Sequence, residues 1–417
     1  DLSIVKDKVR RSIRSNTHRG FVDYHGCDAI CDELSDCLDF AEERLHKGQI
    51  LTSFEVILYI LLTGADLASS ADSSSGSLSF VMDESFEKLE AVCREVAESA
   101  KDADKKACYE KLCKAALKKV LEGWDEWSYD LLRIAVLLVT EKNKGLIDNA
   151  LNDLRSRQKD ERFSDYAQTQ EDLVRLKVIQ ALEGEKAARA FINKRLELDQ
   201  FRELAVDDDL NNGDYENAEK LCLEKTEQLD RRPYGRPSDW WYRLYAIYEK
   251  TNDRPKLIST AKSLLLQGDL QYYKKMKAFL HEDGTWKEVY PLLRSELKTA
   301  LPGYLYAQIL DMEDEDALLL EEVKKGGSAV FQYGKKLARH YPQVIYELYR
   351  GEIIKAAKES SNRSEYNKLC GLIRELHQAG GSDEALALAD QFILEYKRRP
   401  AMLDELAKLK RKLAKSS

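Results

Sequence analysis

Near the start of the chain, thirteen residues hold four side chains that could bind a metal ion: His25, Cys27, Cys31 and Cys37. Thiolate and imidazole are the usual zinc ligands, and Cys27 and Cys31 would lie one helical turn apart. The same cysteines share their helical spacing with a run of apolar residues: Ile30, Leu34, Leu38, Ala41 and Leu45. A reduced, buried cysteine behaves as a small hydrophobic residue. Because a fourth ligand and paired zinc-knuckle spacing are missing, we predict that these cysteines belong to a helix core and hold no metal. Zinc binding and redox chemistry are the alternatives.

Two other features could indicate catalysis. Cys108 and Cys113 are five residues apart, which places them on different faces of a helix. The run His281-Glu282-Asp283-Gly284 combines an imidazole with two carboxylates, but acidic residues followed by glycine are also typical of a turn between helices. The sequence has none of the common phosphate-binding, dinucleotide-binding, zinc-protease or serine-hydrolase motifs. We therefore predict that the chain is not an enzyme and needs no cofactor.

The stretch RRPYGRPSDWWYR at 231–243 mixes arginines with aromatic rings. Arginines can neutralise phosphates while aromatic rings stack on bases, and this combination binds single-stranded nucleic acid. The contact residues would be Arg231, Arg232, Arg236 and Trp240. The alternative is a loop that ends at Ser238 as a helix N-cap, followed by a helix with core residues: Trp241, Leu244, Tyr245 and Tyr248. Helical spacing favours this second interpretation.

The last eighteen residues predict a helix with one apolar stripe, formed by Met402, Leu406, Leu409 and Leu413. Cations gather in its second half, where they complement the helix dipole, and we name three as contact candidates: Lys410, Arg411 and Lys412. A stack of helices needs a terminal element with an apolar inner face and a polar outer face. We predict that this helix is such a cap. The alternative is a basic helix that binds nucleic acid or an acidic partner.

The elements that must position these side chains are helices. Charged residues make up 34% of the 417 residues and hydrophobic ones 43%, with only 7 prolines. Amphipathic helical spacing occurs almost everywhere, and strand-like alternation almost nowhere. The formal charge of −8 argues against a globally basic nucleic-acid binder. The sequence therefore predicts a soluble all-α protein.

The longest apolar run, at 54–68, is interrupted by Gly64 and Asp66. A bilayer-spanning helix needs about 20 apolar residues, so we predict no membrane span. The eight cysteines are scattered without a dense framework, as expected for reduced thiols in a cytoplasmic protein. Because the sequence begins with Asp1 and not methionine, we expect a fragment of a longer protein.

An internal repeat is the strongest pattern in the chain. NGDYENAEKLCLEKTEQLDRRP (212–233) aligns without a gap with AGGSDEALALADQFILEYKRRP (379–400), which matches Gly213 with Gly380 and Ala218 with Ala385. Glycine accepts the turn after one helix, and alanine lets the next helix pack closely. Similar turns at 250–257 and 282–289 give the thirty-to-forty-residue spacing of tetratricopeptide-like pairs. The prediction is an α-solenoid of antiparallel helical hairpins.

We divide the chain into an N-terminal helical region, 1–125, and a helical-repeat solenoid, 126–417. Small polar residues dominate 69–79. They cannot bury enough surface to order themselves, so this segment is predicted to be an exposed loop.

The order of several segments is also familiar. GFVDYHGCDAICDELSDCLDFAEERLHKGQ, WSYDLLRIAVLL, NNGDYENAEKL, DGTWKEVYPLLRSEL, RHYPQVIYELYRGEI and YKRRPAMLDELAKL follow one another. Together they resemble the long helical region that follows the zinc finger in prokaryotic SWIM zinc-finger proteins. The C-x-C…C-x-H motif of that family is absent here, so no zinc ligand carries over. The resemblance implies that the finger precedes residue 1 and contacts DNA or protein.

These patterns predict a non-catalytic scaffold for protein–protein interaction, since stacked hairpins build long grooves. The alternative is a nucleic-acid-associated module that uses the aromatic–basic stretch and the basic C-terminal helix.

Overall fold

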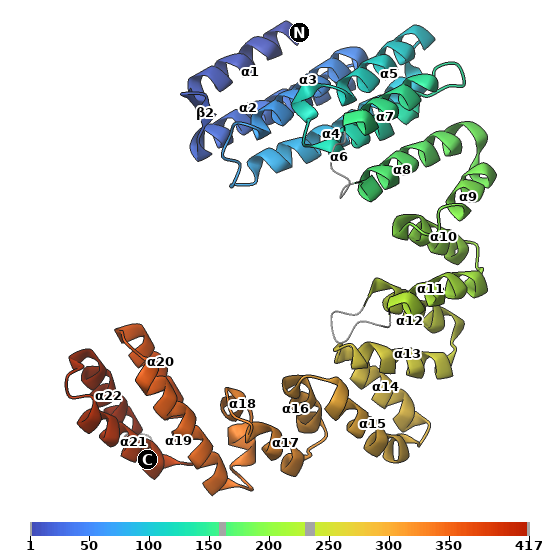
Figure 1. The fold of residues 1–417 in the computed structure, drawn as a ribbon. Coiled ribbons are helices and arrows are strands. Elements are labelled where there is room, and N and C mark those ends of the chain that lie inside the picture. Colours follow the sequence, from blue (N-terminus) through green and yellow to red (C-terminus); the bar gives the residue numbers. More distant parts are fainter. Residues whose placement is uncertain (1, 158–163, 230–237, 415–417) are drawn as a thin grey trace. The chain divides into compact units, whose positions relative to one another are not determined.

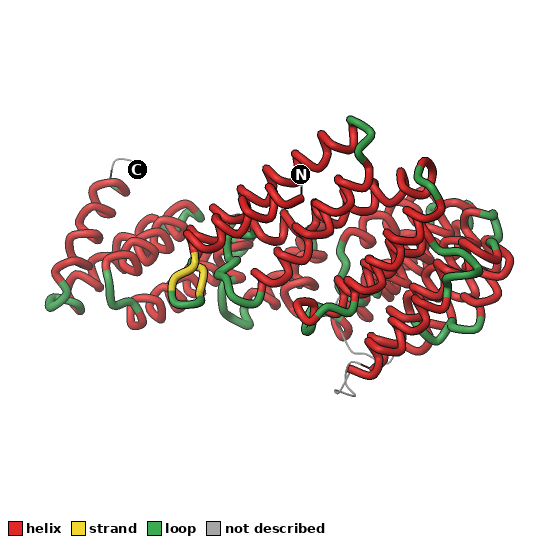
Figure 2. The backbone as a smooth tube through the Cα atoms, turned by 90° about the horizontal axis from the view of Figure 1, so that it is seen from above, coloured by secondary structure: helices red, strands yellow, loops and turns green. Residues whose placement is uncertain are grey.

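The computed structural model describes residues 2–157, 164–229 and 238–414. Within these ranges the chain forms twenty-two α-helices, two short 3-10 helices and one hairpin of two-residue strands. Figure 2 shows helices along nearly the whole backbone, with the hairpin in yellow. The prediction of an all-α protein is confirmed.

The chain divides into two compact units, residues 1–213 and 214–417. The predicted boundary at 125/126 is therefore wrong. The prediction failed because one core of buried apolar side chains, from Val5 to Val174, extends across that position. The helices on either side of the proposed boundary also pack on each other.

Unit 1 contains the two strands β1 (Thr17–His18) and β2 (Phe21–Val22), which pair in antiparallel register. Its helices, in blue to green in Figure 1, are α1 (Leu2–Asn16), α2 (Tyr24–His46), α3 (Ile50–Ala68), α4 (Ser77–Ser99), α5 (Asp102–Ala116), η1 (Lys119–Leu121), α6 (Asp125–Ala135), η2 (Val136–Leu138), α7 (Gly145–Arg157), α8 (Ser164–Glu183), α9 (Glu185–Asn193) and α10 (Asp199–Asn211).

Helix α3 is longer than the apolar run predicted at 54–68. It begins at Ile50, and its 19 residues make it long and apolar enough to cross a membrane by length and composition alone. The side chains of Phe54, Ile57 and Leu61 are fully buried, however, where α3 packs against α2 and α4. Burial of 56% of its most apolar window fits the core helix of unit 1.

The serine-rich segment is a loop as predicted, but α4 already starts at Ser77. Residues 72–76 are exposed. The loop is anchored at its start, because the Val22 amide donates to Ser70 O and the Asp72 amide donates to Val22 O.

Unit 2 is a succession of helical hairpins. Its helices, in green to red in Figure 1, are α11 (Tyr215–Leu229), α12 (Asp239–Thr251), α13 (Arg254–Leu266), α14 (Gln271–Glu282), α15 (Trp286–Ala300), α16 (Gly303–Met312), α17 (Asp316–Val323), α18 (Ala329–Leu337), α19 (Pro342–Glu359), α20 (Arg363–Gln378), α21 (Ser382–Glu395) and α22 (Pro400–Leu413). Each helix packs on the next along α11–α14 and along α16–α22. The predicted α-solenoid of hairpins is confirmed.

The repeat alignment holds in the structure. Gly213 and Gly380 both take positive φ angles, 76° and 100°, which side chains rarely adopt. Ala218 and Ala385 are both fully buried. Pro400 opens α22 as its first residue, where its missing amide hydrogen costs nothing. Residues 231–233, which end the first copy, lie outside the described residues.

Candidate interaction surfaces

The cysteines of α2 belong to the core of unit 1. The Asp23 carboxylate caps the helix by accepting from the Gly26 amide at 2.8 Å. Cys27, Cys31 and Cys37 are then buried, whereas the His25 side chain is exposed. Burial raises the pKa of Cys31 to about 12, so its thiol stays protonated at neutral pH. In the part of the chain that the structure describes, no three His, Cys, Asp or Glu side chains come together to hold a metal ion.

The two other candidates for chemistry are also structural. Cys108 and Cys113 are both buried in α5, and burial raises the pKa of each thiol to about 11. His281 lies in the last turn of α14 and stacks on Trp286, with ring centroids 5.5 Å apart. Gly284, with φ of 74°, makes the turn into α15.

The aromatic–basic stretch is described only in part. Arg231, Arg232 and Arg236 lie outside the described residues. Trp240 is 5% exposed, so little of its ring is available to stack on a base. Ser238 is the N-cap residue of α12, although its side chain makes no capping hydrogen bond.

The predicted core face of α12 is correct except at its first member. Leu244, Tyr245 and Tyr248 are buried. Trp241 is only partly buried, because Trp240 takes the core position at the start of the helix. The buried face of α12 therefore begins one residue earlier than predicted.

Helix α22 packs its apolar stripe against the rest of unit 2. Met402, Leu406, Leu409 and Leu413 are all buried where α22 packs on α20 and α21. Among the three cations named as contacts, the Lys410 ammonium pairs with Asp390 on α21. The Arg411 Nε donates to Ala407 O in the same helix. Lys412 lies in the last turn beside them. The apolar face of α22 is therefore packed against its neighbours, and its cations lie on the other side of the helix or in ion pairs.

A groove runs across the first helices of three successive hairpins in unit 2. It has a volume of about 660 Å³ and is lined by residues of α14, α16 and α18 and the residue before α14: Leu270, Gln271, Lys274, Lys275, Gln308, Asp311, Met312, Gln332 and Tyr333. We call it the amide groove, because each of the three helices contributes one glutamine.

None of these glutamine side chains makes a hydrogen bond within the described parts of the chain. Gln271 and Gln332 are exposed, and Gln308 is half-buried. The Tyr333 hydroxyl in the groove wall is buried and also has no hydrogen-bond partner among the described residues. A carboxamide has both donors and acceptors. The groove therefore offers polar groups that the fold itself does not satisfy.

Two of the three charged residues in the amide groove are held by neighbours. The Lys275 ammonium lies 3.6 Å from Glu249 and over the rings of Tyr245 and Tyr272. Asp311 accepts from the Lys336 ammonium at 2.9 Å. Lys274 is exposed, and its ammonium has no ion-pair partner among the described residues.

The Lys336 ammonium fixes α18 against the turn between α16 and α17. It donates to both Asp311 and Asp314. Asp314 takes a left-handed conformation with φ of 55°, and the hydrogen bond from Lys336 lowers the pKa of its carboxyl group. These hydrogen bonds hold α16 and α18, two walls of the amide groove, together.

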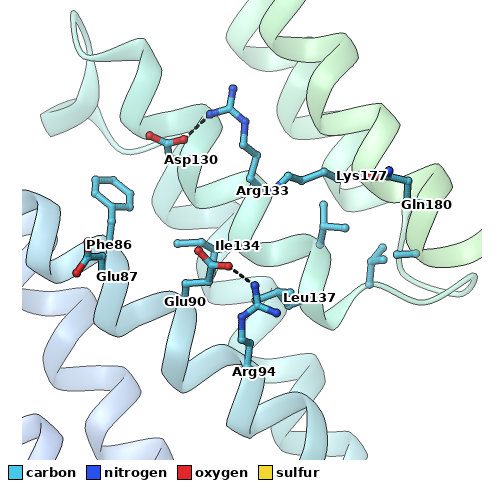
Figure 3. A pocket seen from close by; sticks show the side chains of 13 residues that line it. Phe86, Glu87, Glu90, Arg94, Asp130, Arg133, Ile134, Leu137, Lys177 and Gln180 are labelled. Carbon is cyan, nitrogen blue, oxygen red and sulfur yellow. Dashed lines mark hydrogen bonds and ion pairs between the residues drawn. The ribbon is translucent and has the colours of Figure 1, made fainter. Parts of the chain in front are cut away.

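Another concave surface, of about 700 Å³, lies in unit 1 between α4, α6, η2 and α8. Figure 3 shows Ile134 and Leu137 in its wall and two ion pairs, Glu90–Arg94 and Asp130–Arg133, across its lining. The Arg133 guanidinium also donates to Gln170. Most of its polar lining is thus satisfied internally, which distinguishes it from the amide groove.

Sequence reasoning missed the residues of the amide groove. Gln271, Gln308 and Gln332 each stand alone in an ordinary amphipathic helix, and their spacing in the sequence is irregular. Only the stacking of hairpins brings them together.

Comparison with known proteins adds little. No protein-family model matches the chain, and no curated protein sequence matches it. Among solved structures, one similar chain is described as a "circular tandem repeat protein with novel repeat topology and enhanced subunit contact surfaces". It is 15% identical over 99% of this chain and 96% of that chain, with a TM-score of 0.20. Because that score is low, the fold class rests on the helices of this chain alone.

Proposed function

We propose that this chain is a non-catalytic, cytoplasmic helical-repeat scaffold that binds a protein partner through unit 2. The observation that carries the proposal is the amide groove, in which glutamines from three successive helices line one groove without internal partners. Polar side chains without internal partners on a concave surface can exchange their bound water for hydrogen bonds to a ligand.

The nucleic-acid alternative has less support. The Trp240 ring is buried, and Lys410 is already paired with Asp390. Of the predicted contact residues that the structure describes, these two therefore offer little to a phosphate backbone or to bases. The relationship to SWIM zinc-finger proteins, and DNA contact through an upstream finger, stay predictions.

The proposal can be tested by filling the groove. Gln308→Trp would place a bulky ring at the centre of its lining, whereas Gln343→Trp alters an exposed residue of α19 outside the groove. Each full-length variant and the parent would be used as bait, and the proteins that co-purify would be quantified. We expect a partner that the parent and Gln343→Trp retain and Gln308→Trp loses. Equal recovery by all three baits would contradict a role for the groove.

A further inference from the structure

We infer that the amide groove binds an extended peptide strand, with Gln271, Gln308 and Gln332 bonding to its main chain and Lys274 to an acidic side chain. This inference rests on the proposed scaffold function and names the chemical class of its partner. It follows from the geometry of the lining, its charge and its small apolar area.

The glutamines suit a peptide main chain. A carboxamide can donate to a backbone carbonyl and accept from a backbone amide, so one glutamine can satisfy one peptide unit. A helix with its side chains is about 10 Å across, and an extended strand advances about 3.3 Å per residue. Glutamines on separate hairpins can therefore meet separate residues of one extended strand. Main-chain hydrogen bonds of this kind give affinity in other modes of strand recognition.

The charge of the groove selects an acidic residue. Lys275 and Asp311 are compensated by Glu249 and Lys336. Among the lining residues that the structure describes, Lys274 is the cation without an ion-pair partner. An aspartate or glutamate side chain on the strand would complete this pair.

The lining also argues against other occupants. A docked amphipathic helix needs a row of apolar pockets, yet Leu270, Met312 and the ring of Tyr333 are the main apolar surfaces here. A nucleic-acid strand needs several cations along its backbone, and among the described residues of the lining only Lys274 is uncompensated. An extended peptide uses the amides and needs one cation.

The first experiment selects ligands from a library of random nine-residue peptides that are acetylated at the N-terminus and amidated at the C-terminus. The immobilised full-length chain is incubated with the library, and the retained peptides are sequenced. We expect enrichment of aspartate or glutamate at one position. A chain carrying Lys274→Glu should prefer lysine or arginine there. Lys287→Glu, on the exposed face of α15, makes the same charge change outside the groove and should retain the acidic preference.

The second experiment measures affinity for the most enriched peptide by fluorescence anisotropy. The triple change Gln271→Ala, Gln308→Ala and Gln332→Ala should weaken binding at least ten-fold, as expected for three lost hydrogen bonds. Gln343→Ala should leave binding unchanged. N-methylation of the peptide amides should weaken binding to the parent chain, but should have little further effect on the triple variant.

Three outcomes would overturn the inference: no retained peptide, no acidic preference that Lys274→Glu reverses, or unchanged affinity of the triple variant. The scaffold proposal can fail separately. If Gln308→Trp abolishes capture of a protein partner but peptides show no acidic preference, the scaffold stands and the peptide inference falls. If peptides bind as expected but no protein is captured through the groove, the inference stands and the scaffold falls.

Discussion

Leu406 is the residue through which the role of α22 can be tested most simply. Its side chain is completely buried where α22 packs on α20 and α21. Leu406→Ala removes buried methyl groups and leaves a void, which costs about 2–5 kcal/mol in well-packed cores. For a unit of roughly 200 residues, each kcal/mol lowers the melting temperature by about 2–4 °C. We therefore expect the transition of unit 2 to fall by about 4–20 °C.

Differential scanning calorimetry of the full chain would measure this fall, and hydrogen exchange would show whether α20 to α22 lose protection first. Arg411→Ala is the matched control, because its side chain is exposed and bonds only within its own helix in the described structure. It should change stability by less than about 0.5 kcal/mol. If Leu406→Ala melts like the parent while Arg411→Ala abolishes binding of a partner, α22 is a detached basic helix and the cap is refuted.

Three further predictions concern packing and protonation. A Cβ added at Gly334 would lie 2.5–2.8 Å from the buried side chain of Tyr349, whereas one added at Gly351 would meet nothing within 4 Å. Gly334→Ala should therefore be about 1–3 kcal/mol less stable in urea than Gly351→Ala. Equal urea midpoints of the two variants would contradict this packing. Ala218→Leu should overpack the α11–α12 hairpin by about 1–3 kcal/mol, and a parent-like urea melt would show that the site has room. Burial raises the pKa of Cys37 to about 11, so the protonated thiol favours the folded state fully below about pH 8.5 and that contribution is lost as the pH rises toward 11. The native chain should thus resist iodoacetamide at pH 8, whereas the urea-unfolded chain should react at all eight cysteines. Mass spectra that show labelling of the native chain would refute this.

Local features of the fold could be predicted from the sequence because they depend on neighbouring residues. The spacing of Cys27, Cys31 and Leu34 predicted a buried face, and that face is buried. The stripe of α22 was predicted in the same way. The one-residue error at Trp240 arose because two adjacent tryptophans allow two phases of the helix, and periodicity alone does not choose between them.

Features that depend on distant residues could not be predicted. The chain does not divide at 125/126 because α6 and α7 share the core of α3 to α5, which no local composition reveals; unit 1 extends to Gly213. The amide groove likewise combines Gln271, Gln308 and Gln332 from three hairpins. A lone glutamine in an amphipathic helix looks like any solvent-facing residue until the helices are stacked.

The central claim is that a protein partner occupies the amide groove of unit 2. The most direct measurement replaces Gln308 by a benzophenone-bearing amino acid in the full-length chain, irradiates living cells and identifies the cross-linked protein by mass spectrometry. The same probe at Gln343 is the control. We predict one dominant cross-linked partner from position 308, joined through a short acidic segment, and none from position 343. Cross-linking from position 343 but not from position 308 would contradict the claim.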